Sequence, residues 1–139
     1  MRVRRLVRGD EETVRAAGAL FDRPPSPPAV RAYLTDERNV FFVAEDAGKA
    51  VGFLRGTGLL QVDTRRKQMF LYEIGVAPAY RRRGVGRQLI RALIRYCRSR
   101  GFEEAFVFTD PKNRAAVGLY RSTGARTETP ADRMFVYRL

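Results

Sequence analysis

The chain has 139 residues, a formal net charge of +12, no histidine and one cysteine, and this length fits a single domain over residues 1–139. The missing histidine and the lone Cys97 exclude Cys/His nucleophile pairs and zinc sites, so we expect no metal and assign acid–base chemistry to Glu, Asp, Tyr, Lys or water. The positive charge favours an anionic partner, such as nucleic acid, an acidic surface or a phosphate-rich cofactor.

The first part of the chain predicts an edge strand and two helices. Arg2–Arg8 is strand-like, and its charges precede no apolar core of the kind that a secretory signal needs. No apolar run approaches the roughly 20 residues that span a bilayer, so we expect a cytoplasmic protein without membrane contact. The acidic residues that follow Gly9 favour the start of a helix there. The prolines of Arg23–Pro28 predict a rigid surface turn before a second helix, Ala29–Leu34, with Ser26 or Pro28 ahead of it.

The middle of the chain predicts antiparallel strands. Asn39–Glu45 is rich in Val and Phe, and Ala50–Leu60 follows it after the turn Asp46–Lys49, which is typical of a hairpin. A basic loop, Thr64–Gln68, then leads to the strand Met69–Val76. These segments predict the front of one sheet.

The last part alternates helices and strands. We expect a helix over Val85–Arg100, a strand over Ala105–Thr109, a helix over Asn113–Ser122 and a last strand over Met134–Arg138. The long helix makes a right-handed crossover, so the strands that it joins should be parallel. The predicted fold is mixed α/β (α+β): one sheet of six to seven strands with a parallel pair in its middle, flanked by about four helices.

The junction between the strand Met69–Val76 and the long helix is the most informative segment. Three arginines (Arg81, Arg82 and Arg83) and two glycines (Gly84 and Gly86) open the helix. Unpaired N–H groups and the helix dipole attract phosphate there, and glycine lets an oxygen approach the backbone. The segment is not a P-loop, because Arg87-Gln88 follows Gly86, and it is not a dinucleotide fingerprint, because Leu89 stands where glycine is needed.

Two motifs resemble one known family. The pattern R-x-x-G-x-G at Arg81–Gly86, preceded by Val-x-Pro-x-Tyr, resembles the acetyl-CoA loop of the GNAT superfamily of N-acetyltransferases. The segment Asn113–Gly124 resembles the late motif of that family, N-x-x-A-x-x-L-Y-x-x-x-G. The resemblance implies the GNAT fold, in which two parallel strands splay and the pantetheine arm enters the gap. It implies that acetyl-CoA is bound by Ile74, Val76, Arg81, Arg82, Arg83, Gly84, Val85, Gly86, Arg87 and Asn113.

The resemblance also implies catalytic roles for direct acetyl transfer in a ternary complex. Tyr120 lies near the sulfur as general acid, since a phenol of pKa about 10 can protonate a thiolate of pKa about 8.5. Glu73 is the first candidate for the base and Asp110 the second. The residues alone also allow structural roles: an N-cap for Asn113, core packing for Tyr120, an arginine ion pair for Glu73, and a turn before Pro111 for Asp110.

The acceptor is the least defined partner. We expect a primary amine of a small molecule or peptide. The strand around Glu73, with Tyr33-Leu34 upstream, resembles the small aminoglycoside 3-N-acetyltransferases, although a polycation prefers an acidic pocket and acids near the expected site are few. Dimers are common in the family, so a homodimer is one assembly that the resemblance allows. Two other functions compete with acetyl transfer: a non-catalytic CoA-binding sensor and a nucleic-acid-binding module. The basic segments of the chain suggest the nucleic-acid-binding module, but no RNA-binding motif accompanies them.

Overall fold

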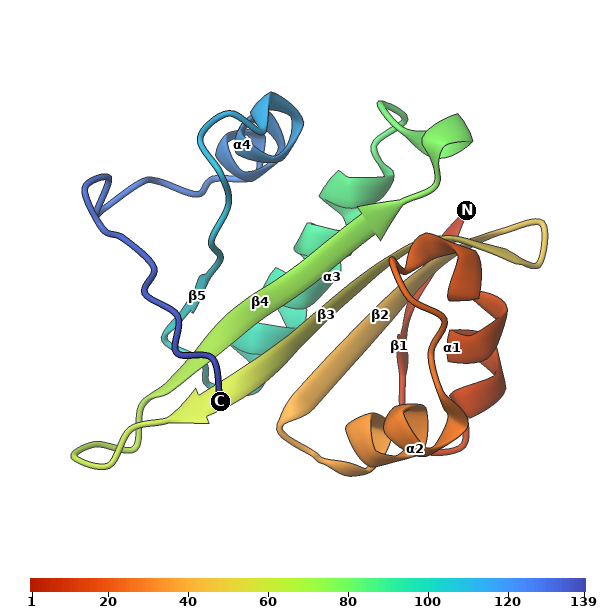
Figure 1. Ribbon diagram of the computed structural model, residues 1–139, viewed down its shortest axis with the longest axis horizontal. Helices are drawn as coiled ribbons and strands as arrows, with labels where there is room; N and C mark the ends of the chain where they lie inside the picture. The colour runs from red at the N-terminus through yellow and green to blue at the C-terminus, as the bar shows by residue number, and fades with distance from the viewer.

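Five strands form one sheet in the order β1-β2-β3-β4-β5 in the computed structural model, which describes residues Met1–Leu139 (Figure 1). The strands are β1 (Arg2–Leu6), β2 (Asn39–Asp46), β3 (Lys49–Leu60), β4 (Lys67–Val76) and β5 (Glu104–Phe106). Neighbours from β1 to β4 are antiparallel, and β4 and β5 are parallel, as the crossover predicts.

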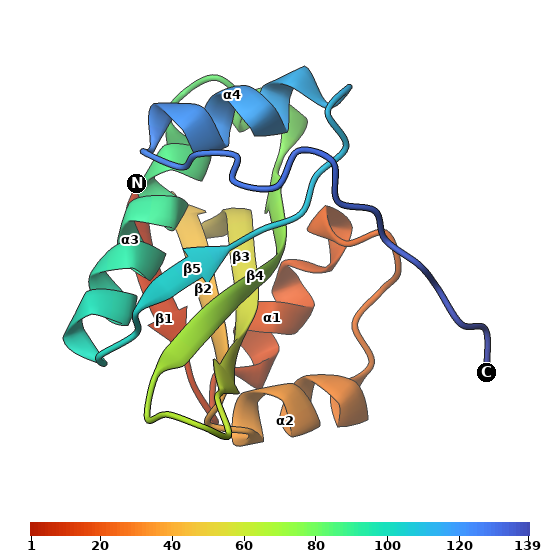
Figure 2. The ribbon, with the colours of Figure 1, turned by 90° about the vertical axis from the view of Figure 1, so that its left-hand side faces the viewer.

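Helices cover both faces of this sheet (Figure 2). They are α1 (Glu11–Ala16), α2 (Pro27–Thr35), α3 (Val85–Ser99) and α4 (Arg114–Ser122), with two 3₁₀ turns, η1 (Gly18–Leu20) and η2 (Pro78–Tyr80). The hydroxyl of Ser26 accepts a hydrogen bond from the Ala29 amide at 3.3 Å and caps α2, which confirms one of the two starts expected there. A membrane span would need a longer and more apolar helix than any that the chain forms.

The alternation of side chains along the strands divides the core into two layers. Phe42 and Leu54 face α3, whose buried stripe includes Leu89. Phe41 and Phe53 face α1 and α2 on the other side. The central strands β2 and β3 are therefore buried on both faces, and the ends of the sheet carry the loops where ligands can bind.

The prediction was wrong in the number of strands and in the place of the parallel pair. The sheet has five strands rather than six to seven, and the pair lies at one edge rather than in the middle. The predicted strand Met134–Arg138 does not form, because it has no neighbouring strand: Phe135 and Tyr137 are 86% and 88% exposed. In Figure 2 this C-terminal segment extends away from the sheet.

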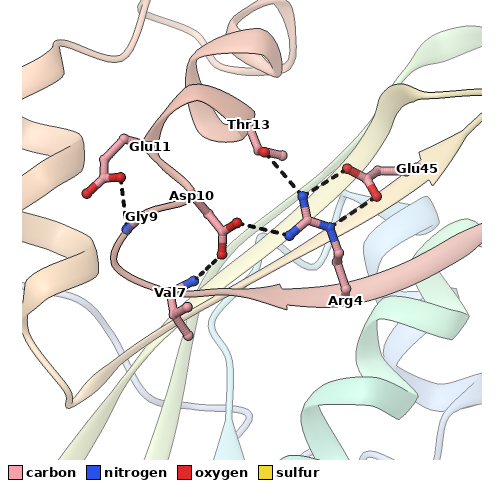
Figure 3. Close-up of polar contacts among 7 residues, drawn as sticks. All are labelled: Arg4, Val7, Gly9, Asp10, Glu11, Thr13 and Glu45. Atoms are coloured by element: carbon pink, nitrogen blue, oxygen red, sulfur yellow. Dashed lines mark hydrogen bonds and ion pairs between the residues drawn. The ribbon is translucent and has the colours of Figure 1, made fainter.

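An arginine of β1 joins three elements on the face of the sheet that α1 covers (Figure 3). The Arg4 guanidinium donates to both carboxylate oxygens of Glu45 at 3.2 and 3.3 Å, to Asp10 at 3.2 Å and to the Thr13 hydroxyl at 3.2 Å. Asp10 also accepts from the Val7 amide at 2.9 Å. The network fixes the start of α1 against β1 and β2.

Replacing this arginine should destabilise the fold. We expect Arg4→Met to lower the free energy of unfolding by about 1–2 kcal/mol, because Glu45 and Asp10 lose their partner while they are only partly exposed. Urea unfolding with an unchanged m-value measures the loss. Arg15→Met is the matched control: Arg15 also pairs with a carboxylate, that of Glu12, but the two side chains are 52% and 80% exposed, so we expect a change within about 0.5 kcal/mol. Equal losses in both variants would contradict the role of the network.

Candidate active site

The loop between β4 and α3 exposes a row of backbone donors. Arg82 and Gly84 adopt left-handed φ angles of 61° and 82°, which turn neighbouring N–H groups toward one side. None of the amides from residue 82 to residue 87 donates a hydrogen bond to another protein group; the first amide with a partner is that of Gln88, bonded to the Gly84 carbonyl at 3.0 Å. These free donors at a helix N-terminus fit the phosphates of a nucleotide.

The arginines of this loop carry charge that no carboxylate compensates. Arg81 donates from Nε to the Val76 carbonyl at 3.2 Å and so ties the loop to the end of β4. The Arg83 guanidinium lies 5.5 Å from the ring centroid of Tyr80. Arg82 and Arg87 are exposed, and none of the four forms an ion pair within the protein. The field of the loop is therefore strongly positive.

Strands β4 and β5 separate beside this loop. Their ladder ends at Phe70 and Phe106, so the rest of β4, from Leu71 to Val76, has no partner on that side. In Figure 1 the chain after β5 leaves the sheet toward α4 while β4 continues to the loop. The splay that the resemblance implies is present.

The register of β4 determines which backbone groups face this separation. The Ala77 amide donates to the Val51 carbonyl at 2.9 Å, so Ala77 and Gly75 direct their hydrogen-bonding groups toward β3. Since these groups alternate along a strand, those of Ile74 and Val76 point away from β3, toward the unpaired edge. Two N–H donors therefore line the open side of β4.

Helix α4 packs beside the loop. A Cβ at Gly86 would lie 3.0 Å from Leu119, so the glycine permits the close approach of α3 and α4. The Asn113 side chain accepts from the Ala116 amide at 3.1 Å, which confirms the N-cap role that the residues alone allow. Tyr120, Ile74 and Val76 all pack against the core cluster beneath α3, and burial raises the pKa of the Tyr120 phenol.

Glu73 lies on the opposite face of β4 from Tyr120. A bulge pairs Arg55 with Glu73 but Gly56 with Leu71, so Tyr72 is the extra residue, and both Tyr72 and Glu73 face the side of α1 and α2. Arg55 donates from Nε to the Glu73 carboxylate at 2.7 Å. The arginine pair expected as the structural alternative for Glu73 is thus formed.

Arg55 is the residue that sequence reasoning missed. Its guanidinium lies 4.3 Å from the ring centroid of Tyr72 and 5.9 Å from that of Tyr33. Burial raises the pKa of Tyr33 to about 12, and this hydroxyl contacts the carbonyl oxygens of Val40 at 3.0 Å and Gly56 at 2.9 Å. A mostly apolar cavity of about 220 Å³ lies between Tyr33, Arg55 and the early helices. The alternation of side chains along β3 predicts which face of the sheet Arg55 occupies. Its partner Glu73 follows only from the register between β3 and β4.

Asp110 has a local role in the loop after β5. Its carboxylate accepts from the Lys112 amide at 2.8 Å, and its carbonyl accepts from the Asn113 amide at 2.9 Å. These bonds form the turn that the residue pattern predicts ahead of α4. The carboxylate of Asp110 is thereby held in the turn.

Comparison with known proteins agrees with this arrangement. Residues 7–125 match the model of the acetyltransferase (GNAT) family. The chain is 32% identical over 109 residues to rat N-acetyltransferase family 8 member 3, covering 78% of this chain and 48% of that protein. It is also 32% identical over 97 residues to human N-acetyltransferase 8, covering 68% of this chain and 41% of that protein. The chain therefore spans less than half of these two relatives.

Solved structures resemble the whole chain. An aminoglycoside acetyltransferase from an uncultured soil metagenomic sample, crystallised with sisomicin, superposes with a TM-score of 0.88 at 27% identity, covering 99% of this chain and 95% of that one. The aminoglycoside N-acetyltransferase AAC(6')-Iy, crystallised with CoA, superposes with a TM-score of 0.78 at 26% identity, covering 99% and 93% of the two chains.

Proposed function

The chain belongs to the acetyltransferase (GNAT) family, and from that membership we propose that it transfers an acetyl group from acetyl-CoA to a primary amine. One observation carries the proposal: the amides from residue 82 to residue 87 have no protein partner and lie at the N-terminus of α3 among uncompensated arginines. In the proposal these amides, with Arg81, Arg82, Arg83 and Arg87, hold the diphosphate of acetyl-CoA.

The thioester end lies in the separation of β4 and β5. The free N–H groups of Ile74 and Val76 line that opening, and we assign to the Val76 N–H the polarisation of the thioester carbonyl. The Asn113 side chain uses its oxygen for the helix cap, so its amide nitrogen is the atom available for the pantetheine arm. Tyr120 returns a proton to the departing sulfur.

The amine is deprotonated on the side of Glu73, directly or through water, and attacks the thioester in a ternary complex. The hydrogen bond from Arg55 orients the Glu73 carboxylate and leaves its second oxygen free to accept a proton. Tyr72 and Tyr33 flank this pair and bound the acceptor side. This makes Arg55 a positioning residue.

The acceptor in this proposal is an amine of a small molecule or a peptide. The structural neighbour crystallised with sisomicin makes aminoglycosides a necessary part of any screen. Charge argues against a polycation, because the carboxylate of Glu73 is already paired with the Arg55 guanidinium. An amine of low positive charge suits this surface better.

Thermal unfolding with and without ligand tests the proposal. Acetyl-CoA at about 100 times its Kd should add roughly 2.7 kcal/mol of stability, which raises Tm by several degrees. A nucleic-acid-binding module would instead respond to an oligonucleotide, with a strong salt dependence. Thiol release with a panel of aminoglycosides, polyamines and peptide N-termini then separates an enzyme from a CoA-binding sensor. If acetyl-CoA stabilised the protein but no amine were acetylated, the protein would be a CoA-binding sensor and not an enzyme.

A further inference from the structure

A second basic region lies at the far end of the sheet from the acetyl-CoA loop. It surrounds a cavity of about 670 Å³ formed where β4 begins and α3 ends. This volume is typical of small-molecule sites, which occupy about 300–1,000 Å³. The acetyl-transfer proposal assigns no role to this cavity, because the loop after Val76 is at the opposite end of β4.

The charged residues that line the cavity are mainly cationic. Five basic side chains face two acidic ones there: Arg5, Arg8, Arg38, Lys67 and Arg100 against Asp36 and Glu37. Two of the cations are already engaged. Arg38 forms an ion pair with Asp36 at 2.7 Å, and Lys67 donates to the Arg100 carbonyl at 2.7 Å.

The other three cations have no polar partner. Arg5, Arg8 and Arg100 form no ion pair and donate no side-chain hydrogen bond within the protein, so their N–H groups remain available to a ligand. Each guanidinium offers a planar fork of donors that matches phosphate or carboxylate oxygens.

Two of these guanidinium groups lie against the same aromatic ring. Arg5 of β1 and Arg100 at the end of α3 lie 5.0 and 5.4 Å from the ring centroid of the half-buried Tyr96. Stacking on one ring restricts both side chains before any ligand arrives, which lowers the entropy cost of binding.

We propose that this cavity binds a small molecule that carries two or more phosphate or carboxylate groups, held by Arg5, Arg8 and Arg100. The concave shape favours a compact polyanion over a nucleic-acid strand, which would need cations that continue past the cavity. The site is separate from the acetyl-CoA loop and does not depend on the transfer reaction.

Calorimetric titration of the protein with inorganic tripolyphosphate tests the site, with CoA present in excess so that the loop before α3 is filled. We expect one equivalent to bind. Arg100→Gln and the pair Arg5→Gln/Arg100→Gln should weaken binding by about tenfold for each arginine removed. Citrate in a parallel titration distinguishes a carboxylate ligand from a phosphate ligand.

The control pair Arg91→Gln/Arg98→Gln removes the same charge from exposed positions of the same helix and should weaken binding less than threefold. Equal weakening in the two pairs would overturn the proposal, since it would mean a diffuse field rather than a site. Backbone amide chemical shifts give a second measure in the unmodified protein. Shifts confined to residues 82–87, with none near Tyr96, or no binding of either anion, would also overturn it.

Discussion

Tyr120→Phe is expected to lower kcat for acetyl transfer by about a hundredfold or more while the Kd for acetyl-CoA changes less than about twofold. The substitution removes only the hydroxyl, so the ring keeps its packing against the core beneath α4. Because burial raises the pKa of this phenol above its ordinary value of 10.0, the proton is present throughout the neutral range. The variant therefore loses a proton donor, and its net charge at neutral pH does not change.

Single-turnover thiol release and calorimetry with CoA measure the two quantities separately. Tyr137→Phe is the matched control, since it removes the same atom from a ring that is 88% exposed in the C-terminal segment, and we expect its kcat to be unchanged. The raised pKa also predicts that wild-type kcat does not decline through loss of the Tyr120 proton until the pH exceeds 10. Turnover of Tyr120→Phe at the wild-type rate would refute the assigned role.

The sequence predicts the elements around the loop well because each has a strong local signal. Gly84 and the arginines mark the start of α3, and the apolar spacing of that helix predicts its buried stripe from Val85 to Cys97. The hairpin turn before β3 follows from Gly48, which adopts a φ of 77°. The last three helices appear within two residues of their predicted bounds, and the first begins at the acids after Gly9, as expected.

What the sequence cannot give is the pairing between distant segments. Arg55 and Glu73 are 18 residues apart and meet only because a bulge at Tyr72 shifts the register of β4. The segment Met134–Arg138 shows the reverse failure: its residues favour a strand, but a strand forms only by pairing with another strand, and this segment pairs with none. Local preference predicts elements, whereas long-range hydrogen bonding determines which of them join the sheet.

Gly84→Val is expected to weaken CoA binding by about a hundredfold, which directly tests the loop. A β-branched residue rarely adopts a φ of 82°, so the valine should rotate the amides of residues 82–87 away from their common direction. Its side chain would also occupy the open space from which a diphosphate approaches, because nothing lies within 4 Å of a Cβ at this position. Calorimetry with CoA measures the effect.

Gly48→Val provides the matched control for backbone strain. Gly48 has a φ of 77°, and a Cβ there also meets nothing within 4 Å, but the residue lies in the hairpin between β2 and β3. Both variants should lose about 2 kcal/mol of unfolding free energy in urea, whereas only Gly84→Val should lose affinity for CoA. If the two variants bound CoA with Kd values within threefold of each other, the diphosphate could not rest on the amides of residues 82–87, and the assignment of the acetyl-CoA site to this loop would fail.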